Sequence, residues 1–225
     1  MTENMMQTFA TAAPVTAIVQ VPAGRIQILA AGQDTTTVEI APADPAKGRD
    51  VTLAGQITTS YADGVLRVAG PARNRVFGST GAVEVRIQLP AGSGVEATAA
   101  SAQFTTDGPL GEVVFDSAQG TVTVGQVATA RLTTVDGDIT VGRLDGDAQL
   151  RTARGDITVA EAGGGTVEAR TETGAITITA AAGVSATLDA GTTTGRISNT
   201  LANTGTPALA IRATTTVGDI TARSQ

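Results

Sequence analysis

The sequence contains no cysteine and no histidine. Without cysteine there is no disulfide framework, no thiolate nucleophile and no cysteine-ligated zinc site. Without histidine the chain lacks the most frequent general base and the most frequent metal-binding side chain of proteins. We therefore predict a protein that is not an enzyme, with no catalytic, cofactor-binding or metal-binding residues.

Aromatic residues are also scarce, at 2% of the 225 residues, and tryptophan is absent. An ordinary globular core takes much of its buried area from aromatic rings. This core must instead be built from valine, isoleucine, leucine, alanine and threonine, several of which favour strands because they are β-branched. The 27 glycines and 8 prolines indicate frequent turns, and no long helix is predicted.

Basic stripes and long apolar runs are missing too. The net charge is −6, and the longest basic cluster is Arg73-Asn74-Arg75, so we expect no nucleic-acid partner. No run of 18 apolar residues exists, so no membrane span is predicted. Residues 1–9 have neither the basic segment nor the apolar stretch of a signal peptide, which leads us to expect a cytoplasmic protein.

What the sequence does have is a repeat of glycine, any residue, aliphatic, any residue and usually a second aliphatic. A second short alternating segment precedes most of these glycines. Alternation with a period of two indicates strands with one apolar face, and glycine allows the sharp corner between them. The repeat begins, at intervals of 17 to 23 residues, at Gly120, Gly137, Gly155, Gly174, Gly195 and Gly218.

The same interior residue types recur at the same offset from each glycine, which is what a parallel β-helix requires. We predict an all-β protein folded as a parallel β-solenoid with about 17–23 residues per coil; a β-sandwich of hairpins is the alternative. In chain order, the predicted ladders are Val122, Ile139, Ile157, Ile176, Ile197, Ile220; then Val124, Val141, Val159, Ile178, a break at Asn199, and Ala222; then Leu132, Leu150, Ala169, Leu188, Ile211.

The first half of the chain carries a looser form of the same pattern. Alternating strands at 15–21 and 83–89 each stop at a proline, which ends ladder pairing. We predict a tail or cap over residues 1–13, an irregular first part of the solenoid over 14–100 and regular repeats over 101–225. A separate small β domain in the first half is the alternative.

Two aspartates could carry chemistry. Stacked one coil apart, Asp138 and Asp156 would lie about 5 Å from each other, a spacing at which paired carboxylates can act as acid and base or hold a cation. An aspartate beside a turn glycine is more commonly a corner residue that hydrogen-bonds its own backbone. We predict that corner role for both, with Arg154 and Arg196 offsetting part of the repulsion.

Three further patterns favour structure over binding. The Asp-Gly-Asp triplets at 136–138 and 145–147 have the nine-residue period of calcium repeats but lack their glycine pattern. The triple glycine at 163–165 lies between strands, where no helix could help to cradle phosphate. A polar ladder fits a β surface better than ice binding; its members are Thr140, Thr158, Thr177, Ser198 and Thr221.

The segments Thr134–Val141 and Thr152–Val159 both read Thr-x-x-Gly-Asp-Ile-Thr-Val, and Leu-Pro-Ala-Gly occupies 89–92. These motifs resemble the bacterial "putative adhesin" β-strand-repeat family, specifically over about 100–225 and more loosely over 14–99. The resemblance implies a single-stranded, right-handed β-helix with a surface or scaffold role. It provides no catalytic motif.

The C-terminal residues Arg223–Gln225 directly follow a strand without a cap. An uncapped solenoid end exposes strand edges and favours end-to-end pairing. We predict a non-enzymatic scaffold or assembly protein that forms homo-oligomers through its solenoid ends. One alternative is a monomeric protein- or glycan-binding module that uses a lateral face or the 42–50 and 71–80 loops; another is a carbohydrate-active β-helix enzyme.

Overall fold

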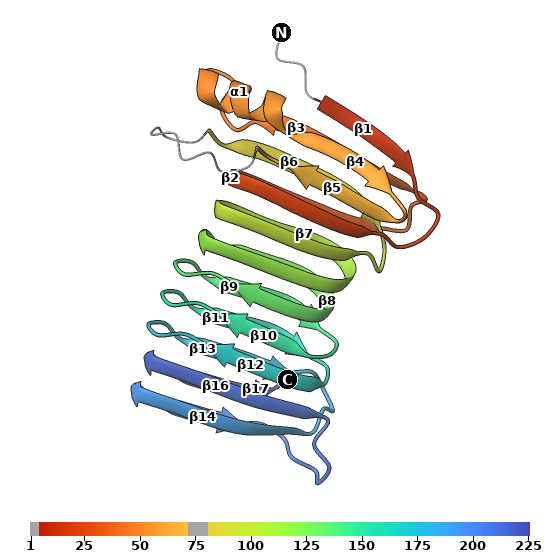
Figure 1. The fold of residues 1–225 in the computed structure, drawn as a ribbon. Helices are drawn as coiled ribbons and strands as arrows, with labels where there is room; N and C mark the ends of the chain where they lie inside the picture. The colour runs from red at the N-terminus through yellow and green to blue at the C-terminus, as the bar shows by residue number, and fades with distance from the viewer. Residues whose placement is uncertain (1–4, 72–80) are drawn as a thin grey trace.

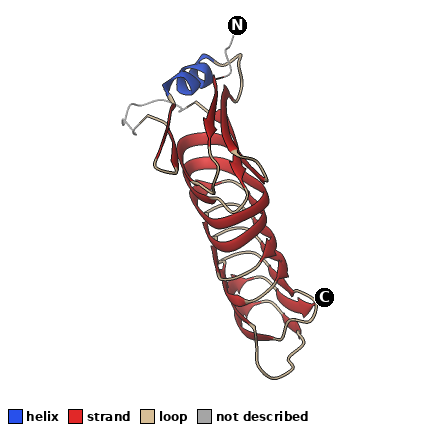
Figure 2. Cartoon of the chain, turned by 90° about the vertical axis from the view of Figure 1, so that its right-hand side faces the viewer, coloured by secondary structure: helices blue, strands red, loops and turns tan. Residues whose placement is uncertain are grey.

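The computed structural model describes residues 5–71 and 81–225. This part of the chain contains 17 strands joined in one sheet and one short helix. The strands stack in successive coils along one direction, giving an elongated rod with the helix at one end (Figures 1 and 2). The prediction of an all-β chain is confirmed. The basic cluster at 73–75 and most of the predicted 71–80 loop lie outside the described residues.

Each regular coil has two strand segments that meet at a corner glycine. We call the segment after the glycine the glycine arm and the segment before it the opposite arm. β8 (Val122–Thr133) is long enough to contribute to both arms. The glycine arm continues through β9 (Ile139–Leu144), β11 (Ile157–Ala162) and β13 (Ile176–Ala180), and the opposite arm through β10 (Ala148–Arg151) and β12 (Gly165–Arg170).

Like side chains stack between neighbouring coils. Val122 pairs with Ile139, Ile139 with Ile157, and Ile157 with Ile176, and all four are buried. In the opposite arm Leu150 lies between Leu132 and Ala169 in the same way. The ladders between described strands of residues 94–225 are all parallel, which a sandwich of hairpins would not give.

The last two coils stack in the reverse of their order along the chain. One coil consists of β14 (Ala186–Thr194) and β15 (Ile197–Thr200), and the other of β16 (Leu209–Val217) and β17 (Ile220–Ser224). β16 pairs with β12 on one side and β14 on the other, while β17 pairs with β13 and β15. The coil of β16 and β17 thus lies between β12 and β13 on one side and the coil of β14 and β15 on the other. β14 lies at the end of the rod (Figure 1).

This reversal corrects two of our predictions. In space the first ladder ends Ile176, Ile220, Ile197, the second ends Ile178, Ala222, Asn199, and the third ends Ala169, Ile211, Leu188. Ile220 is buried between two strands, whereas Ile197 is 47% exposed. The residues at 223–225 therefore do not follow the end strand of the solenoid, and the open end lies at the coil of β14 and β15.

The first half of the chain continues both arms. β2 (Thr16–Ala31) pairs in parallel with β7 (Gly94–Gln119) from Thr16 to Leu29. The next layer, β5 (Val65–Ala69) and β6 (Val83–Pro90), is also parallel to β2. Beyond it lie three antiparallel strands and a helix: β3 (Thr35–Pro42) on β6, β1 (Met5–Ala10) on β3, β4 (Thr58–Ala62) on β5, and α1 (Gly48–Gln56).

One apolar core runs along the rod from Val15 to Ala222. It is almost entirely aliphatic, and its aromatic contribution includes Phe104 stacked on Phe115 with ring centres 4.4 Å apart. Full burial of one isoleucine or leucine stabilises a fold by roughly 1.5–3 kcal/mol. A ladder of such residues therefore gives each coil most of its stability through contact with its neighbours.

Candidate interaction surfaces

The corner glycines form a column in which neighbouring backbones lie very close together. Gly155 has φ +145° and Gly174 has φ +151°, values that L side chains rarely adopt. A Cβ atom on Gly155 would lie 2.2 Å from the carbonyl oxygen of Gly137, and one on Gly174 would lie 2.0 Å from that of Gly155. Glycine is therefore required at this position for two reasons: the positive φ of its own turn, and the close approach of the backbone of the adjacent coil.

A second column at the corner consists of inward-facing threonines. The Thr152 hydroxyl donates to the Gly137 carbonyl (3.0 Å), and the Thr171 hydroxyl to the Gly155 carbonyl (3.1 Å). Thr192 and Thr215 make equivalent bonds with the glycine of the adjacent coil. The sequence analysis missed this role, although the constant three-residue spacing from threonine to glycine is its signal.

The corner aspartates bind backbone groups of the next coil. Asp138 Oδ1 accepts the backbone N–H of Asp156 (2.8 Å), and Asp156 Oδ1 accepts that of Ala175 (2.7 Å). Asp219 Oδ1 does the same for Arg196. The prediction that Asp138 and Asp156 would bond their own backbone is thus wrong in its partner, and one oxygen of each carboxylate holds neighbouring coils together.

The remaining candidate groups are also engaged in structure. Arg154 forms an ion pair with Asp136 at 3.1 Å, and Asp136 is neither of the two aspartates whose repulsion it was expected to offset. Asp147, from the second triplet, accepts the backbone N–H of Thr166. Over residues 5–71 and 81–225, no group of three or more acidic side chains is placed to hold a metal ion.

The opposite-arm face carries charges that largely neutralise one another. Glu168 accepts a hydrogen bond from the Gln149 amide (3.2 Å) and forms an ion pair with Arg151 (3.3 Å). The hydrogen bond from the Gln149 side-chain amide, and after it the positive charge of Arg151, hold the pKa of Glu168 below its ordinary value. Arg212 lies beside Glu168 on the adjacent coil, and Asp189 lies beside Arg212 on the coil beyond it. This face therefore alternates in sign.

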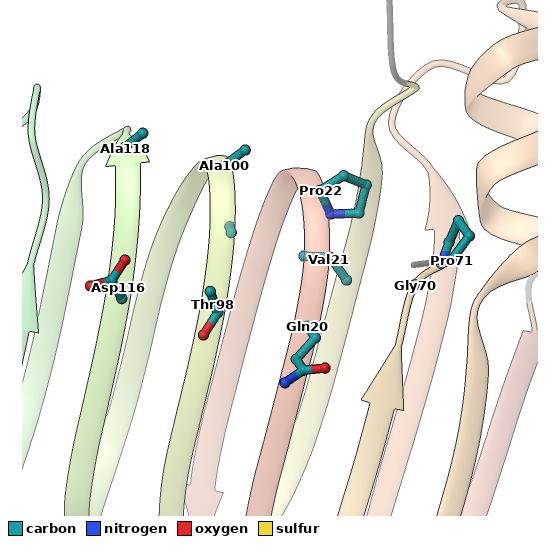
Figure 3. Close-up of a pocket in the computed structure, with 10 residues that line it drawn as sticks. Gln20, Val21, Pro22, Gly70, Pro71, Thr98, Ala100, Asp116 and Ala118 are labelled. Atoms are coloured by element: carbon teal, nitrogen blue, oxygen red, sulfur yellow. The ribbon is translucent and has the colours of Figure 1, made fainter. Parts of the chain in front are cut away.

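A shallow groove of about 480 Å³ crosses the strands of the first half (Figure 3). Gln20, Thr98 and Asp116 lie in a row on its floor, one on each of three successive coils. The rest of its lining consists mainly of alanine, proline and glycine. Small-molecule sites usually combine an enclosed apolar cavity with converging polar groups, and this open groove with its row of polar side chains is not of that kind.

The coil of β14 and β15, which we call the terminal coil, is the remaining surface of interest. On one side β14 pairs with β16 and β15 pairs with β17. On the other side neither has a described strand as a neighbour. The segment 201–208 covers the start of this edge, where Ala186 N–H donates to the Ala202 carbonyl. Beyond that point Leu188 is half-buried and Ile197 is exposed.

The sequence matches the family model described as Toastrack DUF4097 over residues 5–225. The chain belongs to the Toastrack DUF4097 family. This confirms the resemblance to a bacterial adhesin-type strand-repeat family. Among curated proteins, no match to the chain is found.

A solved structure has a similar fold. A protein of Bacteroides fragilis described as a "putative adhesin" has a TM-score of 0.58 and 15% identity, covering 98% of this chain and 97% of its own. A "putative adhesin" of Parabacteroides distasonis has a TM-score of 0.48 and 15% identity, with 97% of both chains covered. In the described part of this Toastrack chain, no helix has the length and apolar character needed to cross a membrane.

Proposed function

We propose that the protein is a non-enzymatic scaffold built on a right-handed β-solenoid, and that it self-associates through the terminal coil. The unpaired edges of β14 and β15 carry this proposal. An edge strand presents a row of N–H and C=O groups that can pair with another chain. Natural edges usually avoid such pairing through lysine, proline, bulges or charges directed inward.

The terminal coil has few of these protective features. β14 and β15 contain no lysine and no proline, and their regular ladders are free of bulges. Between residues 184 and 208 the charged side chains are Asp189 and Arg196, which balance each other although the whole chain carries −6. Two copies can therefore bring these ends together without the repulsion that acts between other parts of their surfaces.

Light scattering after size exclusion, over a concentration series, tests the proposal. The wild-type mass should rise above that of the 22.4 kDa monomer as concentration increases. Ile197→Lys should hold the protein at the monomer mass, because it adds a charge to the exposed edge. The matched control is Val135→Lys, since Val135 is 51% exposed at a corner in the middle of the rod. Equal effects of the two substitutions would contradict the proposal.

The groove of Figure 3 favours a second candidate function, binding of an extended protein or glycan chain along the lateral face. Under this alternative the protein is a monomer at every concentration. Ala100→Trp would fill the groove, and its effect on binding to an array of immobilised glycans and peptides would be measured against wild type. A ligand bound equally by both proteins would argue against the groove.

A further inference from the structure

We infer that the terminal coil binds a second copy of the same chain about a two-fold axis, so that assembly stops at a closed dimer and does not continue into a rod. The inference rests on the proposed self-association and adds the geometry of the contact. It follows from the difference between the two ends of the molecule, the lengths of the exposed edges and the position of one carboxylate.

At the far end of the rod the apolar core is covered, although the outer strands β1 and β4 each have one described ladder neighbour. α1 lies across it (Figures 1 and 2), and Leu53 of this helix and Ile57 after it are buried. The outer strands β1 and β4 approach each other there, with the rings of Phe9 and Tyr61 5.4 Å apart. A terminal coil stacked head-to-tail on this end would meet α1 in place of an open core. Head-to-tail contacts are what generate open filaments, whereas identical ends that meet form a two-fold dimer.

The lengths of the strands select the orientation of the axis. A two-fold axis that crosses both arms places β14 on β14 of the second copy and β15 on its β15, all antiparallel. This arrangement places the longer edge on the longer and the four-residue edge on the four-residue edge, with the Ala186 end of β14 already bonded to Ala202. An axis along the strand direction would place the nine-residue edge on the four-residue edge and leave half of it unpaired. The first arrangement pairs more of the exposed backbone groups and is therefore favoured.

The register follows from side-chain alternation and charge. Leu188 and Ala190 face inward, because their ladder partners Ile211 and Ala213 are buried. A continuous core requires inward residues to face inward residues, so the symmetric ladder must centre on a residue. Centring on Asp189 would oppose two carboxylates directly, which is destabilising. Centring on Ala190 places Asp189 opposite Gly191 of the second copy.

A cysteine at the centre of this contact tests the geometry, and the natural sequence has no cysteine to interfere. Ala190→Cys should form a disulfide-linked dimer under mild oxidation. It should do so about 1,000-fold faster than Ala160→Cys, an exposed position in the middle of the rod, because pairing raises the effective thiol concentration from micromolar to millimolar. Adding Ile197→Lys to Ala190→Cys should abolish the rapid crosslinking.

The mass at high concentration separates the possible outcomes. A mass that saturates at twice the monomer value, with rapid crosslinking of Ala190→Cys, supports the inference. A mass that keeps rising beyond the dimer overturns the closed dimer but leaves self-association standing. A saturated dimer whose Ala190→Cys form crosslinks no faster than the control overturns the two-fold register. A monomer at all concentrations overturns both the inference and the proposed function.

Discussion

At the scale of single residues, the repeat is explained by contacts that each residue makes with the coil beside it. The glycine leaves room for a neighbouring carbonyl, the threonine before it donates a hydrogen bond to that same carbonyl, and the aspartate after it accepts a backbone N–H. The motif therefore records the requirements of stacking. A side chain that looks like a possible acid, base or ligand in the sequence is occupied in holding the coils together.

The glycine column gives the first prediction at this scale. Gly155→Ala should lower the free energy of unfolding by about 2–4 kcal/mol, because the methyl group meets the Gly137 carbonyl at a strained backbone angle. Gly55→Ala is the control, since open space surrounds Gly55 in α1. That substitution should raise stability by roughly 0.5–1 kcal/mol through helix propensity. Urea denaturation monitored by circular dichroism measures both, and equal effects would refute the packing argument.

The threonine column gives a second prediction at the scale of single residues. Thr152→Val keeps the shape of a buried side chain but removes the hydroxyl bonded to the Gly137 carbonyl. Stability should fall by about 1–2 kcal/mol, because the carbonyl loses a partner. Thr158→Val changes a half-buried threonine of the outer ladder and should leave stability within about 0.5 kcal/mol of wild type. A larger loss at position 158 than at 152 would show that the inner hydroxyls are dispensable.

At the scale of elements, the reversed stacking of the last two coils has a direct signature in hydrogen exchange. β17 pairs on both sides, with β13 and β15, whereas β15 pairs on one side. Amides of β17 should therefore exchange as slowly as those of β13, and amides of β14 and β15 should exchange faster. Exchange measured by NMR or mass spectrometry checks this order. Faster exchange in β17 than in β15 would indicate stacking in chain order.

The order of these two coils also shows where prediction from sequence ends. Ile197 and Ile220 are the same residue type at the same offset from glycine, so either fits either layer. Their order is set by the connecting segments 181–185 and 201–208, whose paths are not encoded in the alternating pattern. One signal was present: Asn199 interrupts the second ladder, and a polar residue is best tolerated in a layer open to solvent. It lies in the terminal coil, as that argument requires.

At the scale of the whole molecule, the all-β class and most of the interior ladders could be predicted because they depend on local periodicity. The closed end could not, because the antiparallel pairing of β1, β3 and β6 and the position of α1 depend on contacts between segments without a repeat. The rod is therefore asymmetric, with one end covered and one end open. Its self-association, if it follows the proposed contact, has a built-in limit of two copies.

The insertion of β16 and β17 also affects how the rod can form during synthesis. Residues 186–200 leave the ribosome before residues 209–225, yet they belong one layer farther from the rest of the rod. The earlier segment must either wait for the later one or rest temporarily on β12 and β13 and then be displaced. Translation extends the chain in one direction, and this end of the rod cannot be assembled strictly in that direction.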